Sequence, residues 1–348
     1  MQIASSINGQ RHFNYITMLN VVACLGVVML HANGVFWSHP KGSLWISSNL
    51  IETVMYWPVP IFFMITGATL LEYRSRYSTP VFFKRRFWRV FIPFLFWSVF
   101  AFCVLRFVFG NTDLKLSVSG ILNYEYYYIY WFFPSLFAIY LSMPVLNLLS
   151  RRWKLIACLL LYTFVSYSIL PFLADISVIS VDKAWCSPVS AGYILYALLG
   201  YGLANVELSK KERIILYCLG IIGWGLHFGG TLALTPDYGG EETISQTFKG
   251  YLNFPTVLQA SAVFVLFKYT NFDALFAKES RRKLIERMHA STFGIYLIHQ
   301  YWLTVFDHFD LKNGVMLWRL LVAVIVFALS FVCVQILKQI PVVRRIVP

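Results

Sequence analysis

Charged residues are scarce in this chain of 348 residues. Asp, Glu, Lys and Arg make up only 13% of it, whereas 58% of the residues are hydrophobic and 18% are aromatic. A soluble globular protein has about 25% charged residues. A soluble core of this size does not need so much apolar surface, but a chain in contact with lipid does. The composition therefore predicts an integral membrane protein.

The sequence also lacks the patterns of several common sites. Its six cysteines are scattered, five of them within apolar runs, and none forms a Cys-x-x-Cys pair. We therefore expect neither a disulfide framework nor a zinc or other metal site. No GxxxxGK[ST] loop, GxSxG elbow or HExxH helix occurs. Their absence argues against an ATP-driven pump, a serine hydrolase of the common fold and a membrane zinc protease.

The net charge of +13 raises the question of a nucleic-acid partner. Such binding requires basic residues on one solvated face, interleaved with polar and stacking groups. Here Lys and Arg occur in short clusters between apolar runs, as in the cytoplasmic loops of membrane proteins. We expect no nucleic-acid partner.

Ten apolar runs approach the roughly 20 residues that a helix needs to cross a bilayer. They predict an all-α integral membrane protein with about ten transmembrane helices in a single domain over residues 1–348. The fifth run is expected to end at Pro171, and the first is expected to remain as an anchor rather than to be cleaved as a signal peptide. The runs lie near 14–36, 51–71, 88–109, 127–149, 154–173, 189–206, 213–234, 252–270, 291–308 and 316–337.

The basic residues alternate between the two predicted sides of the membrane. One set of loops, together with both chain ends, carries 22 of the 29 Lys and Arg residues. The opposite side carries only Lys41, Arg106, Lys115, Lys183, Lys249, Lys312 and Arg319, with many of the acidic residues. Since cytoplasmic loops are enriched in Lys and Arg, this pattern predicts an even number of spans with both termini in the cytoplasm.

Ionisable side chains at membrane depth mark candidate functional positions. His31 lies about 17 residues, or roughly 25 Å, along the first predicted span, and Glu52 begins the second span from the outer side. A pair of these two would suit general-base chemistry, because a carboxylate fixes the tautomer of a histidine; each could instead only bond a neighbouring helix. His299 lies about 12 Å into the ninth span and either shares a cavity with His31 or holds a neighbouring helix. We expect His227 to be structural.

The strongest basic cluster is Lys84-Arg85-Arg86-Phe87-Trp88-Arg89, at the cytoplasmic end of the third span. Arg86 and Arg89 are three residues apart and would share one face of a helix. Such a pair can hold phosphate groups through charge-assisted hydrogen bonds, as in a nucleotide or coenzyme A. The alternative is that the cluster only retains the loop in the cytoplasm, against anionic membrane lipids.

Several blocks together resemble the acyltransferase-3 family of bacterial membrane proteins, and the resemblance covers nearly the whole chain. Each block alone is ordinary apolar sequence, but their order and their polar insertions are those of the family. The blocks are LNVVACLGVVMLH (19–31), VPIFFMITGATLL (59–71), KRRFWRVFIPFLFW (84–97), YWFFPSLFAIYLSMPVL (130–146), AGYILYALLGYGLA (191–204) and STFGIYLIHQ (291–300).

The resemblance implies a ten-helix enzyme of the bacterial cytoplasmic (inner) membrane. Such an enzyme takes an acyl group, usually acetyl from acetyl-CoA, and transfers it to a hydroxyl of a cell-envelope glycan or lipid-linked sugar. His31 corresponds to the family's catalytic histidine, and Arg86 and Arg89 correspond to its Arg-x-x-Arg pair near the donor. Thr66 stands where the family has Ser before a glycine, and His299 matches the histidine of the late block.

One departure concerns the donor. The family usually has an arginine eleven residues before the first histidine and an acid three residues earlier, where this chain has Asn20 and Thr17. The donor is then bound otherwise, for example by Lys84 to Arg89, or the donor or activity differs. At the outer side, the aromatic rings of Trp131, Trp37 and Tyr130 are candidates for stacking on a sugar, or are interface anchors.

Two other functions compete with acyl transfer. The first is an exporter or flippase of a lipid-linked sugar, since intramembrane histidines also serve proton-coupled transport. Such transporters typically have repeated halves with interrupted helices, and neither is evident in this sequence. The second is an inactive relative that binds a partner, suggested by Asn20.

Overall fold

The computed structural model describes residues 2–37, 42–179, 192–238, 243–309, 315–341 and 343–347, with side chains from residue 14 onward. Predictions that concern Lys41, Asp182, Lys183, Cys186, Glu241, Glu242, Asp310 and Lys312 lie outside these residues. The described part contains no strand. Its α-helices are α1 Gln2–Ala32, α2 Ser43–Val54, α3 Pro58–Leu70, α4 Thr79–Arg86, α5 Ile92–Cys103, α6 Val118–Leu122, α7 Phe132–Leu148, α8 Trp153–Phe164, α9 Leu170–Asp175, α10 Ile194–Asn205, α11 Lys210–Leu234, α12 Phe254–Tyr269, α13 Asp273–Ala277, α14 Glu279–His308 and α15 Met316–Leu337.

Each of the ten predicted spans coincides with a helical segment, so the all-helical prediction is confirmed for the described residues. In the part of the chain that the structure describes, seven segments are long and apolar enough to cross a membrane: Asn14–Ala32, Ser43–Ser75, Thr79–Val108, Tyr128–Leu148, Trp153–Asp175, Lys210–Leu234 and Met316–Leu337. Two further apolar helices, α10 and α12, are shorter. The remaining segment, α14, matches the ninth predicted span. It starts with a charged stretch and is apolar only in its second half. The number of crossings and the sidedness stay predictions.

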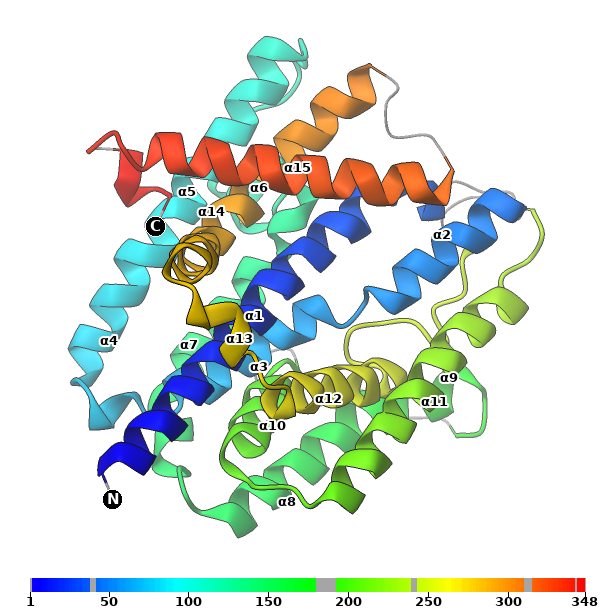
Figure 1. The fold of residues 1–348 in the computed structure, drawn as a ribbon. Coiled ribbons are helices and arrows are strands. Elements are labelled where there is room, and N and C mark those ends of the chain that lie inside the picture. Colours follow the sequence, from blue (N-terminus) through cyan, green and yellow to red (C-terminus); the bar gives the residue numbers. More distant parts are fainter. Residues whose placement is uncertain are drawn as a thin grey trace.

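Helix α1 lies at the centre of the helical assembly, in contact with α3, α12, α14 and α15 (Figure 1). Its residues Leu19, Ala23 and Val28 are fully buried, as expected for a helix that is apolar on all sides and enclosed by others. The last turn of α1 carries His31, and the second half of α14 carries His299. The contact between these two helices is therefore the one that positions the candidate site.

Two glycines allow α3 and α10 to approach each other closely. A Cβ on Gly67 would lie 1.8 Å from the carbonyl oxygen of Ala197, and a Cβ on Gly200 would lie 2.1 Å from the carbonyl oxygen of Met64. Both contacts are with backbone atoms, which cannot move aside as a flexible side chain could, so neither position has room for a Cβ. Small residues at such crossings are typical of membrane helix pairs, where van der Waals packing rather than the hydrophobic effect drives association.

The second predicted span is interrupted. Helix α2 ends at Val54, and α3 starts at Pro58 after the turn Met55–Trp57. Pro58 has no N–H to donate to the carbonyl of Val54, and the helix ends before Trp57 could donate to that of Thr53, so both carbonyls need other donors. The side-chain amide of Gln259, on α12, donates to both, at 3.0 and 3.3 Å. The sequence analysis predicted a single run over 51–71 and did not locate this break.

Within the described residues, three π-helical segments interrupt the longer spans: Phe87–Phe91, Val104–Val108 and Val165–Ile169. The last one corrects the expectation that the fifth span ends at Pro171. The π-turn precedes Pro171, which then falls in the first turn of α9, and the helical segment continues to Asp175. Proline is tolerated there because the first N–H groups of a helical turn have no partner to lose.

Candidate functional site

His31 and His299 face each other across the contact of α1 and α14. The Nδ1 atom of His31 lies 2.7 Å from the Nε2 atom of His299, and the two rings are nearly parallel, with centroids 5.0 Å apart. His299 is fully buried, whereas His31 is partly exposed. The structure thus brings together the two histidines that the sequence analysis placed on separate spans.

The hydrogen bonds assign the protons of this pair. The Nδ1 atom of His299 lies 3.1 Å from the carbonyl oxygen of Ile295, which can only accept, so Nδ1 carries the proton. In a neutral imidazole the other nitrogen, Nε2, is then an acceptor, and His31 must donate to it from Nδ1. This arrangement places the lone pair of His31 on Nε2. That is the tautomer a base needs, held by His299 in the way a carboxylate would hold it.

A buried arginine secures the chain just beyond His31. Arg319, on α15, is 1% exposed and donates to the Oδ1 atom of Asn33 at 2.8 Å and to the hydroxyl of Ser47 at 2.5 Å. Asn33 in turn donates to the carbonyl oxygen of Ser48. These bonds join the end of α1 to α2 and α15, and so fix the position of His31 two residues earlier.

Glu52 pairs with Lys249, and not with His31 as the sequence analysis expected. Its carboxylate is 2.6 Å from the ammonium of Lys249, and both side chains are almost fully buried. Burial lowers the pKa of Lys249, and the nearby carboxylate opposes that shift. The expected His31–Glu52 pair is not among the contacts of the described residues, in which His299 occupies the place beside His31.

Aromatic side chains lie beside each of the two pairs. The ring of Tyr128 lies 6.0 Å from that of His31. Tyr251 stacks between Tyr56, at 4.3 Å, and Trp131, at 5.2 Å. Of these, Tyr128 is 60% exposed, and Trp131 and Tyr251 are partly exposed.

The other two predicted acceptor residues have different surroundings. Trp37 is 37% exposed and contacts Lys249, whose ammonium lies 5.1 Å from the ring centroid. Tyr130 is buried at 1% and donates to the carbonyl oxygen of Leu297 at 3.3 Å. The environment of Tyr130 is that of a packing residue, so Trp131 and Trp37 are the better placed of the three to meet a ligand.

Asn20 belongs to a polar cluster nearer the N-terminal end of α1. Its amide donates to Nδ1 of His289 at 2.8 Å and to the hydroxyl of Thr292 at 2.9 Å. Asn20, Thr66 and Thr292 supply the polar atoms of a cavity of about 150 Å³ between α1, α3, α7 and α14. Tyr296 also lines this cavity, and its ring lies 5.8 Å from that of His299. The cavity therefore approaches the histidine pair from the side of Asn20.

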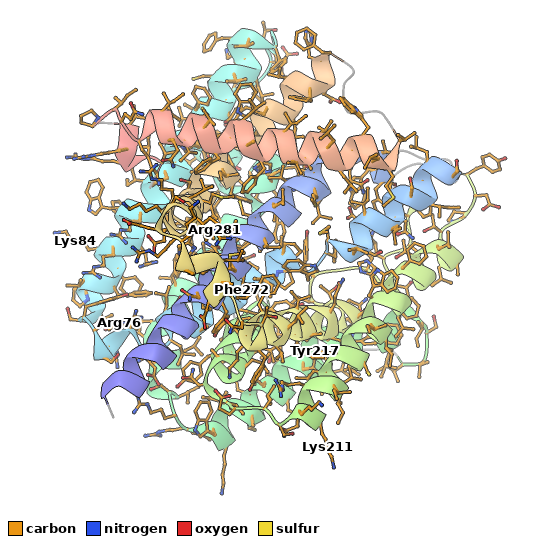
Figure 2. All side chains as sticks on the ribbon, viewed as in Figure 1. Arg76, Lys84, Lys211, Tyr217, Phe272 and Arg281 are labelled. Atoms are coloured by element: carbon orange, nitrogen blue, oxygen red, sulfur yellow. The ribbon has the colours of Figure 1, made fainter. Side chains whose placement is uncertain are left out.

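The basic cluster divides into one inward and several outward residues. The guanidinium of Arg86 lies over the rings of Phe82 and Tyr140, at 5.7 and 5.6 Å, and its buried Nε atom has no partner in the described part of the chain. Lys84, Arg85 and Arg89 are exposed, and Lys84 projects from α4 at the side of the molecule (Figure 2). Arg89 lies within the π-turn, in which hydrogen bonds run from i to i+5. The wider turn means that Arg89 does not lie on the same helix face as Arg86, as it would in a regular α-helix.

A family model described as an acyltransferase domain matches residues 13–337. The chain belongs to the acyltransferase-3 family. It is therefore a multi-pass membrane acyltransferase, which uses an acyl donor and an acyl acceptor, and the exporter without bond-making is set aside. Comparisons with curated proteins and with solved structures gave no match.

Sequence reasoning missed three residues of this acyltransferase to which the structure gives defined partners. They are His289 beside Asn20, Lys249 beside Glu52, and the buried Arg319 beside Asn33 and Ser47. The sequence analysis counted Lys249 and Arg319 only among the basic residues of the outer side and gave them no role. Their partners lie 197 and 286 positions away, and no local pattern marks such pairs. His227, expected to be structural, is fully buried and packs edge-on against Tyr56, at 4.8 Å.

Proposed function

We propose that this enzyme transfers an acyl group, most simply acetyl, from an acyl-CoA donor bound on the cytoplasmic side to a hydroxyl of a cell-envelope glycan or lipid-linked sugar. The observation that carries the proposal is the hydrogen bond between His31 and His299, which leaves the base nitrogen of His31 as Nε2. Family membership supplies acyl transfer, and the pair supplies a base for it.

The proposed chemistry needs one base. Nε2 of His31 takes the proton of the acceptor hydroxyl while its oxygen attacks the thioester carbon. The C–S bond then breaks, and the thiolate of coenzyme A takes up the proton from the His31 imidazolium. Alternatively, Nε2 itself attacks the thioester carbon, and the C–S bond breaks to release the thiolate of coenzyme A. The acceptor hydroxyl then attacks the acyl group on Nε2, the N–acyl bond breaks, and the thiolate takes up the proton of the hydroxyl. In both routes His299 orients His31 and stabilises the charge that develops on it.

The donor is proposed to approach from the basic cluster. Arg86 offers an unpartnered Nε–H, and the exposed Lys84, Arg85 and Arg89 offer further positive charge for phosphate groups. The cavity beside Asn20, Thr66 and Thr292 suits the thioester end of the donor, because it is narrow, largely apolar and close to His299 through Tyr296. Its volume of about 150 Å³ favours a short acyl group such as acetyl over a long chain.

The acceptor is proposed to meet His31 on the side of Tyr128 and Trp131. Partly exposed aromatic rings near a base suit a sugar, whose C–H faces stack on them. The Glu52–Lys249 pair is proposed to act here as a support, because it holds the interrupted second span and the ring of Tyr56 beside Tyr251.

The test is transfer of radiolabel from acetyl-CoA to envelope glycan in membranes that contain the wild-type enzyme or His31→Ala. Label is expected with the wild type and a loss of about a hundredfold to ten-thousandfold with the variant. His308→Ala is the matched control, because His308 lies exposed at the end of the same helix as His299. Equal labelling by wild type and His31→Ala would remove His31 from the mechanism, and no label from well-folded wild type would refute acetyl-CoA as donor.

A further inference from the structure

The polar atoms of the cavity beside Asn20 are all of one kind. Four of the side chains that line this cavity of about 150 Å³ can form hydrogen bonds: Asn20, Thr66, Thr292 and Tyr296. What each offers to an occupant depends on which of its hydrogens are already donated to other groups. The existing hydrogen bonds of these four side chains therefore define the chemistry that the cavity can bind.

The three hydroxyl groups have donated their hydrogens to backbone carbonyls. Thr66 and Thr292 donate to carbonyls four and three residues earlier in their own helices, at 2.8 and 2.9 Å. Tyr296 donates to the carbonyl of Ile129. A carbonyl oxygen can only accept, so the direction of each bond is fixed. Each hydroxyl oxygen is left with lone pairs alone.

The amide of Asn20 is oriented by the same network. Because the hydroxyl hydrogen of Thr292 points to a carbonyl, its oxygen accepts from the amide nitrogen of Asn20. The second N–H of that amide points to Nδ1 of His289, at 2.8 Å. The side-chain oxygen Oδ1 has no partner among the described residues, and protein atoms do not enclose it. Asn20 lies on the central helix α1, where it lines the cavity, so Oδ1 is an acceptor open to an occupant (Figure 1).

A cavity that offers acceptors but no donors selects its occupant. A carbonyl or a phosphate needs donors and finds none on the lining side chains that the structure describes, whereas an N–H or O–H group is satisfied. The arginine that the family usually has at position 20 would offer only donors, so the chemistry there is the opposite in this chain. The occupant is an N–H or O–H group on a narrow, mainly apolar chain. The apolar walls come from Phe62, Ile65, Phe132, Leu136 and Phe293.

The cavity also lies between the two ends of the proposed donor site. Leu136 of its wall is one turn of α7 before Tyr140, whose ring contacts the guanidinium of Arg86. In the other direction, Thr292 and His299 are seven residues apart on α14, or about 10 Å. Coenzyme A carries its thioester on a pantetheine arm, and the two amide nitrogens of the extended arm lie roughly 5 and 10 Å from the thioester carbon. The farther amide matches the distance from Thr292 to His299.

We propose that Oδ1 of Asn20 accepts a hydrogen bond from the N–H of the pantetheine amide that is farther from the thioester. Asn20 is then a specificity-determining residue, which selects a donor with an amide-bearing arm. The thioester lies at the Tyr296 end of the cavity, next to the histidine pair. The inference rests on the proposed acyl-CoA donor and states how this chain recognises it.

The test is titration calorimetry of the purified full chain in detergent with acetyl-CoA and two analogues. In each analogue, CH2 replaces the N–H of one pantetheine amide. The dissociation constant is the readout, because it does not require turnover. We expect the analogue altered at the farther amide to bind about threefold to tenfold more weakly, the value of one hydrogen bond. The analogue altered at the nearer amide is the matched control and should bind as acetyl-CoA does.

Two variants test the role of the residue itself. Asn20→Leu should weaken the binding of acetyl-CoA and abolish the difference between acetyl-CoA and the farther-amide analogue. Thr69→Val is the control, because Thr69 donates to the carbonyl four residues earlier, as Thr66 does, but lines a different cavity. Thr69→Val should keep the affinity for acetyl-CoA and the difference between the two ligands.

Equal binding of acetyl-CoA and the farther-amide analogue by the wild type would overturn the proposal, and this comparison does not depend on the folding of any variant. A difference that persists in Asn20→Leu would overturn it too. Absence of acetyl-CoA binding would overturn both this proposal and the proposed donor. Amide-dependent binding without transfer to a glycan would support the role of Asn20 and refute only the proposed function.

Discussion

At the residue scale, His299 acts on His31 through one hydrogen bond whose direction is fixed by the carbonyl of Ile295. Substitution by alanine removes the acceptor and lets the ring of His31 turn, so His299→Ala should lower kcat by about tenfold to a hundredfold. Glutamine can still accept from His31 through its side-chain oxygen, and His299→Gln should retain more activity than alanine. The measurement is kcat and the KM for the donor in both variants.

The values of kcat and of the donor KM distinguish a role of His299 in positioning His31 from a role in folding alone. A positioning role leaves the KM of the donor unchanged while kcat falls, with partial rescue by glutamine. Equal losses in the alanine and glutamine variants, or a loss confined to KM, would contradict the role assigned to His299.

The buried pair of Glu52 and Lys249 should show strong coupling in stability. Removing one partner leaves an uncompensated charge, so Glu52→Gln or Lys249→Met should each lower the free energy of unfolding by about 3–5 kcal/mol. The double variant should cost less than the sum of the two. Reversible unfolding in detergent measures all three, and additive losses would argue against the ion pair.

An exposed pair on α14 serves as the control. Lys283 and Glu279 are four residues apart, 2.6 Å from each other and more than half exposed. Removing either should change the free energy of unfolding by less than about 1 kcal/mol, because solvent screens such pairs.

The sequence identified His31 and His299 because a histidine in an apolar run is conspicuous by itself. It did not pair them, because helices that are adjacent in space are here 268 positions apart in the chain. Glu52 was proposed as the partner of His31 from an estimate of depth, which says nothing about the face on which a side chain lies. The Asn20–His289 contact was missed because His289 follows a charged stretch that looked like an ordinary cytoplasmic loop.

At the element scale, the close contact of α3 and α10 can be tested with two glycines of one helix. Gly200→Ala would place a methyl group 2.1 Å from a backbone oxygen of α3 and should lower the free energy of unfolding by about 1–3 kcal/mol or more. Gly202→Ala meets nothing within 4 Å and should raise it by about 0.5–1 kcal/mol, since glycine is a poor helix former. Melting temperatures that shift equally in both variants would contradict this packing.

The π-turn after α4 separates Arg86 from Arg89 and predicts unequal roles. Arg86→Lys removes the Nε–H, so it should raise the KM for acetyl-CoA about tenfold with kcat little changed. Arg89→Lys keeps a positive charge at an exposed position and should change the KM less than about twofold. The measurement is a donor titration in each variant, and equal effects would restore the original expectation of one shared face.

Helix positions followed from hydrophobicity, but breaks within helices did not. The ten apolar runs located the helical segments because burial in lipid or protein demands long apolar stretches. Whether Pro58 ends a helix or Pro171 merely falls in its first turn depends on which donors neighbouring helices supply, such as Gln259 for the second span. The sequence around each proline does not show which distant side chains supply those donors.

At the scale of the whole molecule, the predicted sidedness places the basic cluster on the cytoplasmic face and His31 towards the outer half of the first span. His31 is roughly 25 Å along α1 from Asn14, by the rise of an α-helix, and the cavity beside Asn20 lies between. This arrangement predicts that donor and acceptor approach from opposite sides of the membrane.

The most direct test uses sealed vesicles of defined orientation, with acetyl-CoA on the face that bears the basic loops and a glycan acceptor enclosed on the other. The account predicts that radiolabelled acetyl reaches the enclosed glycan with the wild type and with His308→Ala, but not with His31→Ala. Transfer that is unaffected by His31→Ala, or that requires donor and acceptor on the same face, would contradict it.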